Sequence, residues 1–301
     1  TGMRPRLRPG TLSFHGMTLK RASWQNLLPL YSPKRQATSL ALRQCHLSPR
    51  CRGLAAATLV GNDPERGKAE EVDTCLKTEK LKPLPVGGAA EAVAIVACGA
   101  FSPPTTAHIK MMETAKVQIE ELGKAVVVGG FLSPVSDGYQ KEDLVHGLHR
   151  LEMTSRAIQD NDWISNDEWE IRQSGWTRTR FVLERFHRDI KKHYGQPIKT
   201  LFLCGGDVVE TFEIPGIWAR ADVHSLLQQG VVAITRDSVD LSSFIKQSTF
   251  LAPYEKRIHV VRFENPVSST LVRAKLRANE SVDGMVHRSV LDYIQTARLY
   301  T

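Results

Sequence analysis

The stretch that decides the fold is VAIVACGAFSPPTTAH, residues 93–108. Its first six residues are apolar without alternation, which is typical of a strand buried on both faces of a parallel sheet. Gly99 and two prolines then indicate a turn and a stiffened loop, and residues 107–122 have the pattern of a helix. The stretch therefore predicts a strand, a loop and a helix start, which is the repeating unit of an α/β protein.

The same alternation continues to the end of the chain. Together with residues 93–98, the apolar runs are 125–132, 200–204, 231–235 and 258–263. Helices are expected at 107–122, 147–160, 177–194, 207–213, 240–247, 268–279 and 287–297, among others. This order predicts an α/β fold, a doubly wound, Rossmann-like parallel sheet with helices on both faces, formed by residues 91–301. In such sheets ligands bind beyond the carboxyl ends of the strands.

Positive charge is concentrated at the start of the chain. The net charge of +8 comes from 40 Lys and Arg against 32 Asp and Glu, yet residues 1–60 hold ten Lys or Arg and no acidic residue. Residues 61–301 therefore hold 30 basic and 32 acidic residues, a balance of −2. A protein that binds nucleic acid carries its positive charge on the folded domain, so we expect no nucleic-acid partner.

Residues 1–90 are predicted to be a disordered basic leader and linker, ending in the Pro- and Gly-containing segment 83–88. The leader's arginine-rich, acid-free composition is typical of a mitochondrial or plastid transit peptide. Two alternatives stay open: a retained tail or a translated upstream segment would leave the protein in the nucleus or cytoplasm. No run approaches the ~18 apolar residues of a transmembrane helix, so no membrane span is expected. The sequence leaves open whether the chain forms a homo-oligomer.

Two predicted helix starts offer hydrogen-bond donors to phosphate. The first follows Gly99, which lets a ligand approach the backbone closely, and His108 lies about one turn into the helix. The second is VSSTLVR, residues 267–273, with three hydroxyl residues and Arg273 at helical spacing. The alternatives are a structural histidine and simple helix capping, although one hydroxyl is enough for a cap. Neither segment is a GxGxxG fingerprint or a GxxxxGK[ST] loop, which argues against a dehydrogenase and a P-loop ATPase.

Four motifs together resemble one family. The loop GAFSPPTTAH (99–108) resembles the GxFxPxTxxH element of eukaryotic nicotinamide/nicotinate-mononucleotide adenylyltransferases, members of the nucleotidyltransferase superfamily. Residues 267–273 resemble that family's ISSTxxR motif. SPVSDGYQK (133–141) is similar to its SPVxDxYxK loop, and LCGGD (203–207) to its LCGxD turn. The motifs stand in the family's order between about residues 93 and 300, which makes residues 91–301 the expected catalytic domain.

On the ATP side, the resemblance implies roles for the glycine loop and the second helix start. His108 would hold ATP phosphates and, with Arg273, stabilise the charge on departing pyrophosphate. Arg236 is a further candidate, although an arginine at a strand end is also typical of a solvated side chain. The implied ATP-binding residues are Ala100, Phe101, His108, Arg236, Ser268, Ser269, Thr270 and Arg273. Mg²⁺ is expected as cofactor, held by ATP phosphates and water with no metal ligand from the protein.

On the mononucleotide side, Trp176 and Trp218 match the two aromatic positions that hold the pyridine ring, since indole stacks well on a pyridinium. Either Trp alone could be core packing, which is the role we assign to Trp169. Asp207 could accept ribose hydroxyls or cap the next helix. Glu142 stands where the family often has a second Lys beside Lys141. The implied mononucleotide-binding residues are Gly99, Ala100, Phe101, Lys141, Trp176, Thr179, Gly205, Asp207, Ile217 and Trp218.

The resemblance implies an enzyme of NAD biosynthesis. It would join ATP and nicotinamide or nicotinate mononucleotide into NAD or deamido-NAD, with His108, Arg273 and Lys141 as the catalytic residues. The sequence does not separate the amide from the acid substrate. Two alternatives remain: a relative that adenylylates another phosphate ester, such as a pantetheine phosphate, and a non-catalytic dinucleotide-binding or chaperone-like module. The paired tryptophans argue against the first, and the intact His108 and Arg273 argue against the second.

Overall fold

The computed structural model describes residues 72, 74–85, 90–123, 125–139, 141, 143–235 and 240–301, and the statements below concern these residues. Most of the expected leader, together with Glu142 and Arg236, lies outside them.

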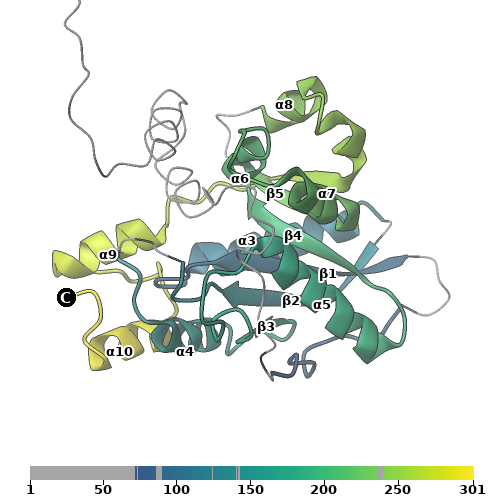
Figure 1. Ribbon diagram of the computed structural model, residues 1–301. Coiled ribbons are helices and arrows are strands. Elements are labelled where there is room, and N and C mark those ends of the chain that lie inside the picture. The colour runs from purple at the N-terminus through teal and green to yellow at the C-terminus, as the bar shows by residue number, and fades with distance from the viewer. Residues whose placement is uncertain are drawn as a thin grey trace, which may run out of the picture. The chain divides into compact units, whose positions relative to one another are not determined.

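A six-stranded parallel sheet forms the centre of the described fold (Figure 1). Its strands are β1 (Glu91–Gly99), β2 (Ala125–Pro134), β3 (Ile164–Asn166), β4 (Lys199–Gly205), β5 (Val231–Thr235) and β6 (Ile258–Arg262). Their order across the sheet is β3-β2-β1-β4-β5-β6. The chain thus winds outward in one direction from β1 and in the other from β4, which confirms the predicted Rossmann-like doubly wound sheet.

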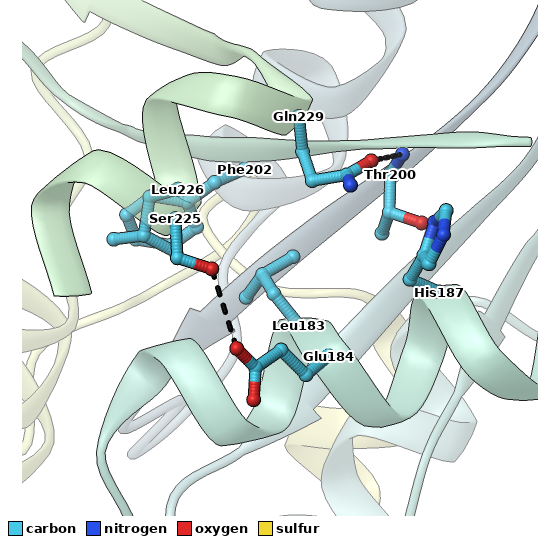
Figure 2. Close-up of a pocket in the computed structure, with 8 residues that line it drawn as sticks. All are labelled: Leu183, Glu184, His187, Thr200, Phe202, Ser225, Leu226 and Gln229. Carbon is cyan, nitrogen blue, oxygen red and sulfur yellow. Dashed lines mark hydrogen bonds between the residues drawn. The ribbon is translucent and has the colours of Figure 1, made fainter. Parts of the chain in front are cut away.

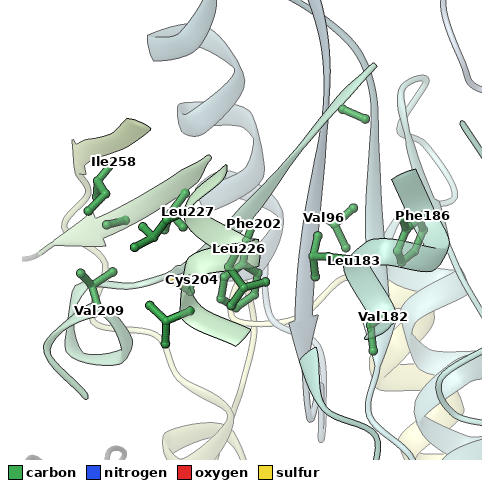
Figure 3. Packing of buried hydrophobic residues seen from close by; sticks show 14 of the residues in the cluster. Val96, Val182, Leu183, Phe186, Phe202, Cys204, Val209, Leu226, Leu227 and Ile258 are labelled. Atoms are coloured by element: carbon green, nitrogen blue, oxygen red, sulfur yellow. The ribbon is translucent and has the colours of Figure 1, made fainter. Parts of the chain in front are cut away.

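Helices cover both faces of this sheet. They are α3 (Thr106–Glu121), α4 (Gly147–Ala157), α5 (Thr179–Tyr194), α6 (Gly206–Thr211), α7 (Arg220–Gln229), α8 (Leu241–Gln247), α9 (Ser269–Arg277) and α10 (Arg288–Thr296), with a short 3-10 helix at Ala252–Arg257. Apolar residues of α5, α6, α7 and α8 pack on one face in a single cluster, part of which Figure 3 shows. Residues of α3 pack on the other face in a second cluster. None of the described helices has the length and apolar character needed to cross a membrane.

Alternation within the strands assigns side chains to the two faces. Val96 and Phe202 point into the cluster with α5 and α7, whereas Ile95 and Leu201 point into the cluster with α3. All four are at most 4% exposed. Because every strand is buried on both faces, the continuous apolar runs in the sequence are what this sheet requires.

A third apolar cluster joins α4, α9 and α10, which lie together on one side of Figure 1. It contains Met153, Val272 and Val290, all fully buried. The cluster fixes the chain's last two helices against α4 and so brings residues from the end of the sequence back to the loop after β1. Thr106, at the start of α3, donates its backbone N–H to the carbonyl of Met285 at 2.9 Å.

Candidate active site

A cavity of about 670 Å³ opens at the carboxyl ends of the central strands. Its floor includes Gly99 at the end of β1 and Gly205 at the end of β4. These two strands are neighbours from which the chain winds in opposite directions, so the cavity lies at the switch point of the sheet. Its volume is in the range of cofactor-sized sites, about 300–1,000 Å³.

Most of the residues predicted for the site line this one cavity. They are Gly99, Ala100, Phe101, His108, Lys141, Trp176, Thr179, Gly205, Asp207, Trp218, Ser268, Ser269, Thr270 and Arg273. Ile217 is buried and is not part of the wall. Arg236 lies outside the described residues. The fold therefore gathers six separate segments of the sequence around one space.

The loop after β1 is held in an unusual conformation. Phe101 has φ 46°, a left-handed value that a bulky side chain adopts only when its surroundings enforce it. Its ring is buried, covers Gly99 and meets the His108 ring edge-on, with centroids 5.2 Å apart. A Cβ on residue 99 would lie 3.1 Å from the Phe101 ring, so glycine makes this folded-back loop possible.

His108 is oriented by the first turn of its own helix. Its Nδ1 accepts the backbone N–H of Thr105 at 3.0 Å and lies 2.8 Å from the Thr105 hydroxyl. With Nδ1 as an acceptor, the proton of the neutral imidazole is on Nε2. The ring therefore offers a donor on its other nitrogen, and the residue lines the cavity at the positive end of α3.

The start of α9 is docked on the loop after β1. Ser268 caps the helix by accepting the N–H of Leu271 at 3.2 Å. Ser269 does not cap the helix; its hydroxyl donates to the carbonyl of Pro103 at 2.8 Å. Arg273 donates from Nη1 to the carbonyl of Ser102 at 2.9 Å. Capping thus accounts for one hydroxyl of the three, and the segment as a whole closes one side of the cavity.

Arg273 combines burial with an unused donor. The residue is 8% exposed, and its Nε has no hydrogen-bond partner in the described part of the chain. Its Nη2 lies 3.6 Å from the carboxylate of Asp143, which also pairs with Arg277 at 2.6 Å. The hydrogen bond from Arg277, with the nearby charges of both arginines, lowers the pKa of Asp143. This carboxylate, which the sequence analysis did not find, orients a guanidinium that still has a donor for a ligand.

The indole of Trp218 and the backbone of Trp176, both in the cavity wall, are each in close contact with a neighbouring residue. Trp218 donates its Nε1–H to the Thr211 hydroxyl at 2.9 Å and meets Phe212 edge-on at 5.2 Å between centroids. Trp176 lies against Gly138, since a Cβ on residue 138 would come within 2.4 Å of the Trp176 backbone nitrogen. The loop after β2 can support Trp176 this closely because residue 138 is glycine. Trp169 instead belongs to the apolar core, which agrees with its assignment to packing.

Three polar groups near the cavity were not found from the sequence. Arg150 is fully buried and donates to the carbonyls of Val145 (2.8 Å) and Ala100 (3.2 Å) and to the carboxylate of Asp137 (2.8 Å). Tyr300 contacts the Ser102 hydroxyl at 2.9 Å, and burial raises the tyrosine's pKa to about 12. Glu170, 3% exposed, also lines the cavity. No motif marks these residues, because their partners are backbone atoms or distant side chains.

A second, smaller cavity of about 200 Å³ lies between α5 and α7 (Figure 2). Gln229 accepts the N–H of Thr200 there at 3.5 Å, and Ser225 donates to Glu184 at 3.3 Å. The space is below the size of ordinary ligand sites, and none of the predicted site residues lines it. We therefore assign the chemistry to the larger cavity.

Comparison with known proteins identifies the family. Residues 96–275 match the cytidylyltransferase-like family. The chain is 33% identical to the nicotinamide-nucleotide adenylyltransferase of Drosophila melanogaster, over 80% of this chain and 67% of that protein. It is 34% identical to the nicotinamide/nicotinic acid mononucleotide adenylyltransferase of Oryza sativa subsp. japonica, over 77% of this chain and 96% of that protein. This chain belongs to the nicotinamide/nicotinic acid mononucleotide adenylyltransferase family.

A yeast member of this adenylyltransferase family, enzyme 2 of Saccharomyces cerevisiae, is 36% identical over 68% of this chain and 55% of its own length. All four motifs that carried the resemblance lie within residues 96–275. Each of them also contributes residues to the wall of the larger cavity. The membership predicted from the sequence is thus confirmed, and the family's motifs meet in space where a doubly wound sheet binds its ligands.

Proposed function

We propose that the larger cavity joins the AMP part of ATP to nicotinamide or nicotinate mononucleotide, forming NAD or deamido-NAD and pyrophosphate. The observation that carries the proposal is that one cavity has two chemically different walls, one rich in hydrogen-bond donors and one aromatic. The start of α3 and the start of α9 supply hydroxyl, imidazole and guanidinium donors, while two indoles line the wall nearer α5 and α6. The first surface suits a triphosphate and the second suits a flat pyridinium ring.

On the ATP side, we assign the triphosphate to His108, Ser268, Ser269, Thr270 and Arg273. Support comes from the unpartnered Nε of Arg273, which is costly to bury without a ligand to accept its hydrogen bond. The Nε2–H of His108 is the second donor. Ala100 and Phe101 would contact the nucleotide through the loop backbone. Arg236 stays a candidate, from the segment that follows β5.

On the mononucleotide side, Trp176 and Trp218 would enclose the pyridine ring, with Thr179 beside it. Gly205 would meet the ribose through its backbone, and Asp207, for whose carboxylate the glycine leaves room, would accept the hydrogen bonds of the ribose hydroxyls. A Cβ on residue 205 would come within 2.2 Å of the Asp207 Oδ1, so this carboxylate lies directly over the glycine. Lys141 would contact the mononucleotide phosphate, and Ile217 would contribute a backbone contact only.

The reaction needs alignment and charge stabilisation more than proton transfer. An oxygen of the mononucleotide phosphate bonds to the α-phosphorus of ATP, the bond from that phosphorus to the bridging oxygen breaks, and pyrophosphate leaves with the electron pair. The attacking phosphate is already an anion, so no general base is required. His108 and Arg273 donate hydrogen bonds to the phosphates that gain charge, and Lys141 holds the attacking group in line.

Magnesium is proposed to arrive with ATP. The donor set at the α3 and α9 starts consists of hydroxyl, imidazole and guanidinium groups, which bind phosphate oxygens and not Mg²⁺. Among the described residues, no group of three or more His, Cys, Asp or Glu side chains is placed to hold a metal ion. When bound to ATP, Mg²⁺ would neutralise part of the phosphate charge.

The test measures pyrophosphate release by the full chain with ATP and Mg²⁺. Nicotinamide mononucleotide, nicotinate mononucleotide and pantetheine phosphate are offered in turn. We expect release and dinucleotide formation only with a pyridine mononucleotide. His108→Ala should lower kcat by roughly 10²–10³, the usual effect of removing one donor to developing charge. His193→Ala, at an exposed histidine on α5, is the matched control and should retain the rate.

Release with pantetheine phosphate alone would assign the chain to a different acceptor. No release with any acceptor would favour a non-catalytic binding module. Equal losses in the two histidine variants would contradict the role given to His108.

A further inference from the structure

Glu170 is a buried carboxyl group inside the mononucleotide half of the cavity. It is 3% exposed, and it lines the cavity together with Trp176, Thr179 and Tyr139. Its Oε2 accepts the hydroxyl of Ser133 at 2.5 Å. In the sheet, Ser133 lies beside Cys98, the last residue of β1 before Gly99. Glu170 is therefore fixed near the carboxyl ends of β1 and β2.

Arg150, the cation whose charge acts on Glu170, directs its hydrogen bonds to other groups. Arg150 uses Nε, Nη1 and Nη2 for the carbonyls of Val145 and Ala100 and for Asp137. A buried carboxyl group without a cationic donor favours its neutral form. Burial first, and then the charge of Asp167, raise the pKa of Glu170 to about 8, although the Ser133 hydrogen bond and the charge of Arg150 oppose the rise.

We propose that Glu170 is a specificity-determining residue of the pyridine subsite, whose carboxyl group hydrogen-bonds the ring's 3-substituent and so admits nicotinate as well as nicotinamide. The proposal rests on the function proposed above. Because Oε2 accepts from Ser133, the acid proton lies on Oε1, which can donate to an amide oxygen or to a carboxylate oxygen. An ionised Glu170 would repel the negative carboxylate of nicotinate and would still accept a hydrogen bond from the nicotinamide N–H.

The consequence is a substrate preference that changes with pH. The other titratable groups that face Glu170 are Cys98 from β1, Tyr139 from the loop after β2 and Asp167 from the loop after β3. Burial raises the pKa of Cys98 well above its usual value and that of Tyr139 to about 12, so both stay protonated near neutrality. Burial also raises the pKa of Asp167, although its pairing with Arg185 opposes the rise. Glu170 is the member of this set with a pKa close to 8.

The experiment measures kcat/KM of the full chain for nicotinate and for nicotinamide mononucleotide from about pH 6.5 to pH 9.5. The ratio of the two values is the readout. Changes with pH in the protonation of the shared phosphate, of ATP and of His108 affect both substrates alike and so cancel in this ratio. We expect the acid-to-amide ratio to fall about tenfold between pH 7 and pH 9, as the protonated fraction of a group with pKa near 8 does. Glu170→Gln, which cannot ionise, should give a ratio that does not change with pH.

Two further variants make the test specific. Ser133→Ala removes the hydrogen bond that lowers the pKa of Glu170, so the fall in the ratio should move to higher pH. Glu210→Gln changes another carboxyl that lines the cavity and should keep the wild-type profile. Three outcomes would overturn the proposal. The acid-to-amide ratio of the wild type does not change with pH, its decrease persists in Glu170→Gln, or its decrease is lost in Glu210→Gln. Dinucleotide formation from neither mononucleotide would instead contradict the proposed function.

Discussion

Replacing Glu170 by glutamine is expected to remove a pH dependence from the stability of the protein. Burial raises the pKa of this carboxyl in the native state to about 8, against 4.5 for an ordinary glutamate. Between these two values the native state keeps a proton that the unfolded chain has lost. The free energy of unfolding therefore falls as the pH rises, and the contribution of Glu170 is fully present only below pH 4.5.

The size of the effect follows from the difference in pKa. Each pKa unit corresponds to about 1.4 kcal/mol. A rise in the pKa from 4.5 to about 8 therefore lowers the free energy of unfolding by on the order of 5 kcal/mol over the whole pH interval. About 4 kcal/mol of this falls between pH 5 and pH 8. Glutamine has no proton to lose in this range. The free energy of unfolding of the wild type minus that of Glu170→Gln should therefore decrease by this amount.

The assay is urea unfolding at a series of pH values, followed by tryptophan fluorescence. Glu264→Gln, at an exposed carboxyl, controls for the loss of one negative charge. If the difference between wild type and Glu170→Gln stays constant within about 1 kcal/mol from pH 5 to pH 9, Glu170 is ionised in the native protein. That result would refute the argument from burial and would also remove the basis for an uncharged carboxyl in the pyridine subsite.

Two other predictions address the walls of the cavity. Gly138→Ala places a Cβ 2.4 Å from the backbone nitrogen of Trp176, so it should cost about 1–3 kcal/mol in unfolding free energy and raise KM for the mononucleotide more than KM for ATP. Gly175→Ala, whose Cβ meets nothing within 4 Å, is the control, and an equal effect in both would contradict the close-approach argument. Arg273→Lys loses the guanidinium that donates to Ser102 and that we propose to bind the phosphates, and we expect kcat/KM for ATP to fall by roughly 10² in steady-state kinetics. In Arg277→Lys, one turn further along α9, kcat/KM for ATP should fall much less.

The sheet could be predicted from the sequence because a strand that is buried on both faces appears there as a continuous apolar run. Five of the six strands lie where continuous apolar runs were found, and the run 231–235 coincides with β5. The strand that was missed, β3, has three residues and too little sequence to show a pattern. Helix α7 was also missed. It carries a buried carboxylate, Asp222, which pairs with Arg178 at 2.5 Å, and that pairing is invisible until the chain is folded.

The candidate site was predictable where the residues that line the cavity belong to local motifs. The loop 99–108 and the segment 267–273 are recognisable because phosphate binding needs glycine, hydroxyl and cationic residues at fixed spacing. Residues that act through other residues belong to no motif that could be recognised in the sequence. Asp143 orients Arg273 from 130 positions away in sequence, and Glu170 stands in an ordinary mixed segment. Their importance comes from burial and from partners that only the fold brings close.

Arg150 shows how the fold places the motifs relative to one another. Its guanidinium is fully buried, and its three hydrogen bonds reach the loop after β1 through Ala100, the loop after β2 through Asp137, and the turn before α4 through Val145. Burial alone would raise the pKa of Asp137, but the Gly147 N–H and Arg150 lower it, so the partner stays anionic. A buried charge is costly, and removing one partner costs more than the pair contributes. Such a pair is therefore best explained by position: it holds the loop after β1 and the loop after β2 at one fixed separation, which the proposed in-line transfer between two bound substrates requires.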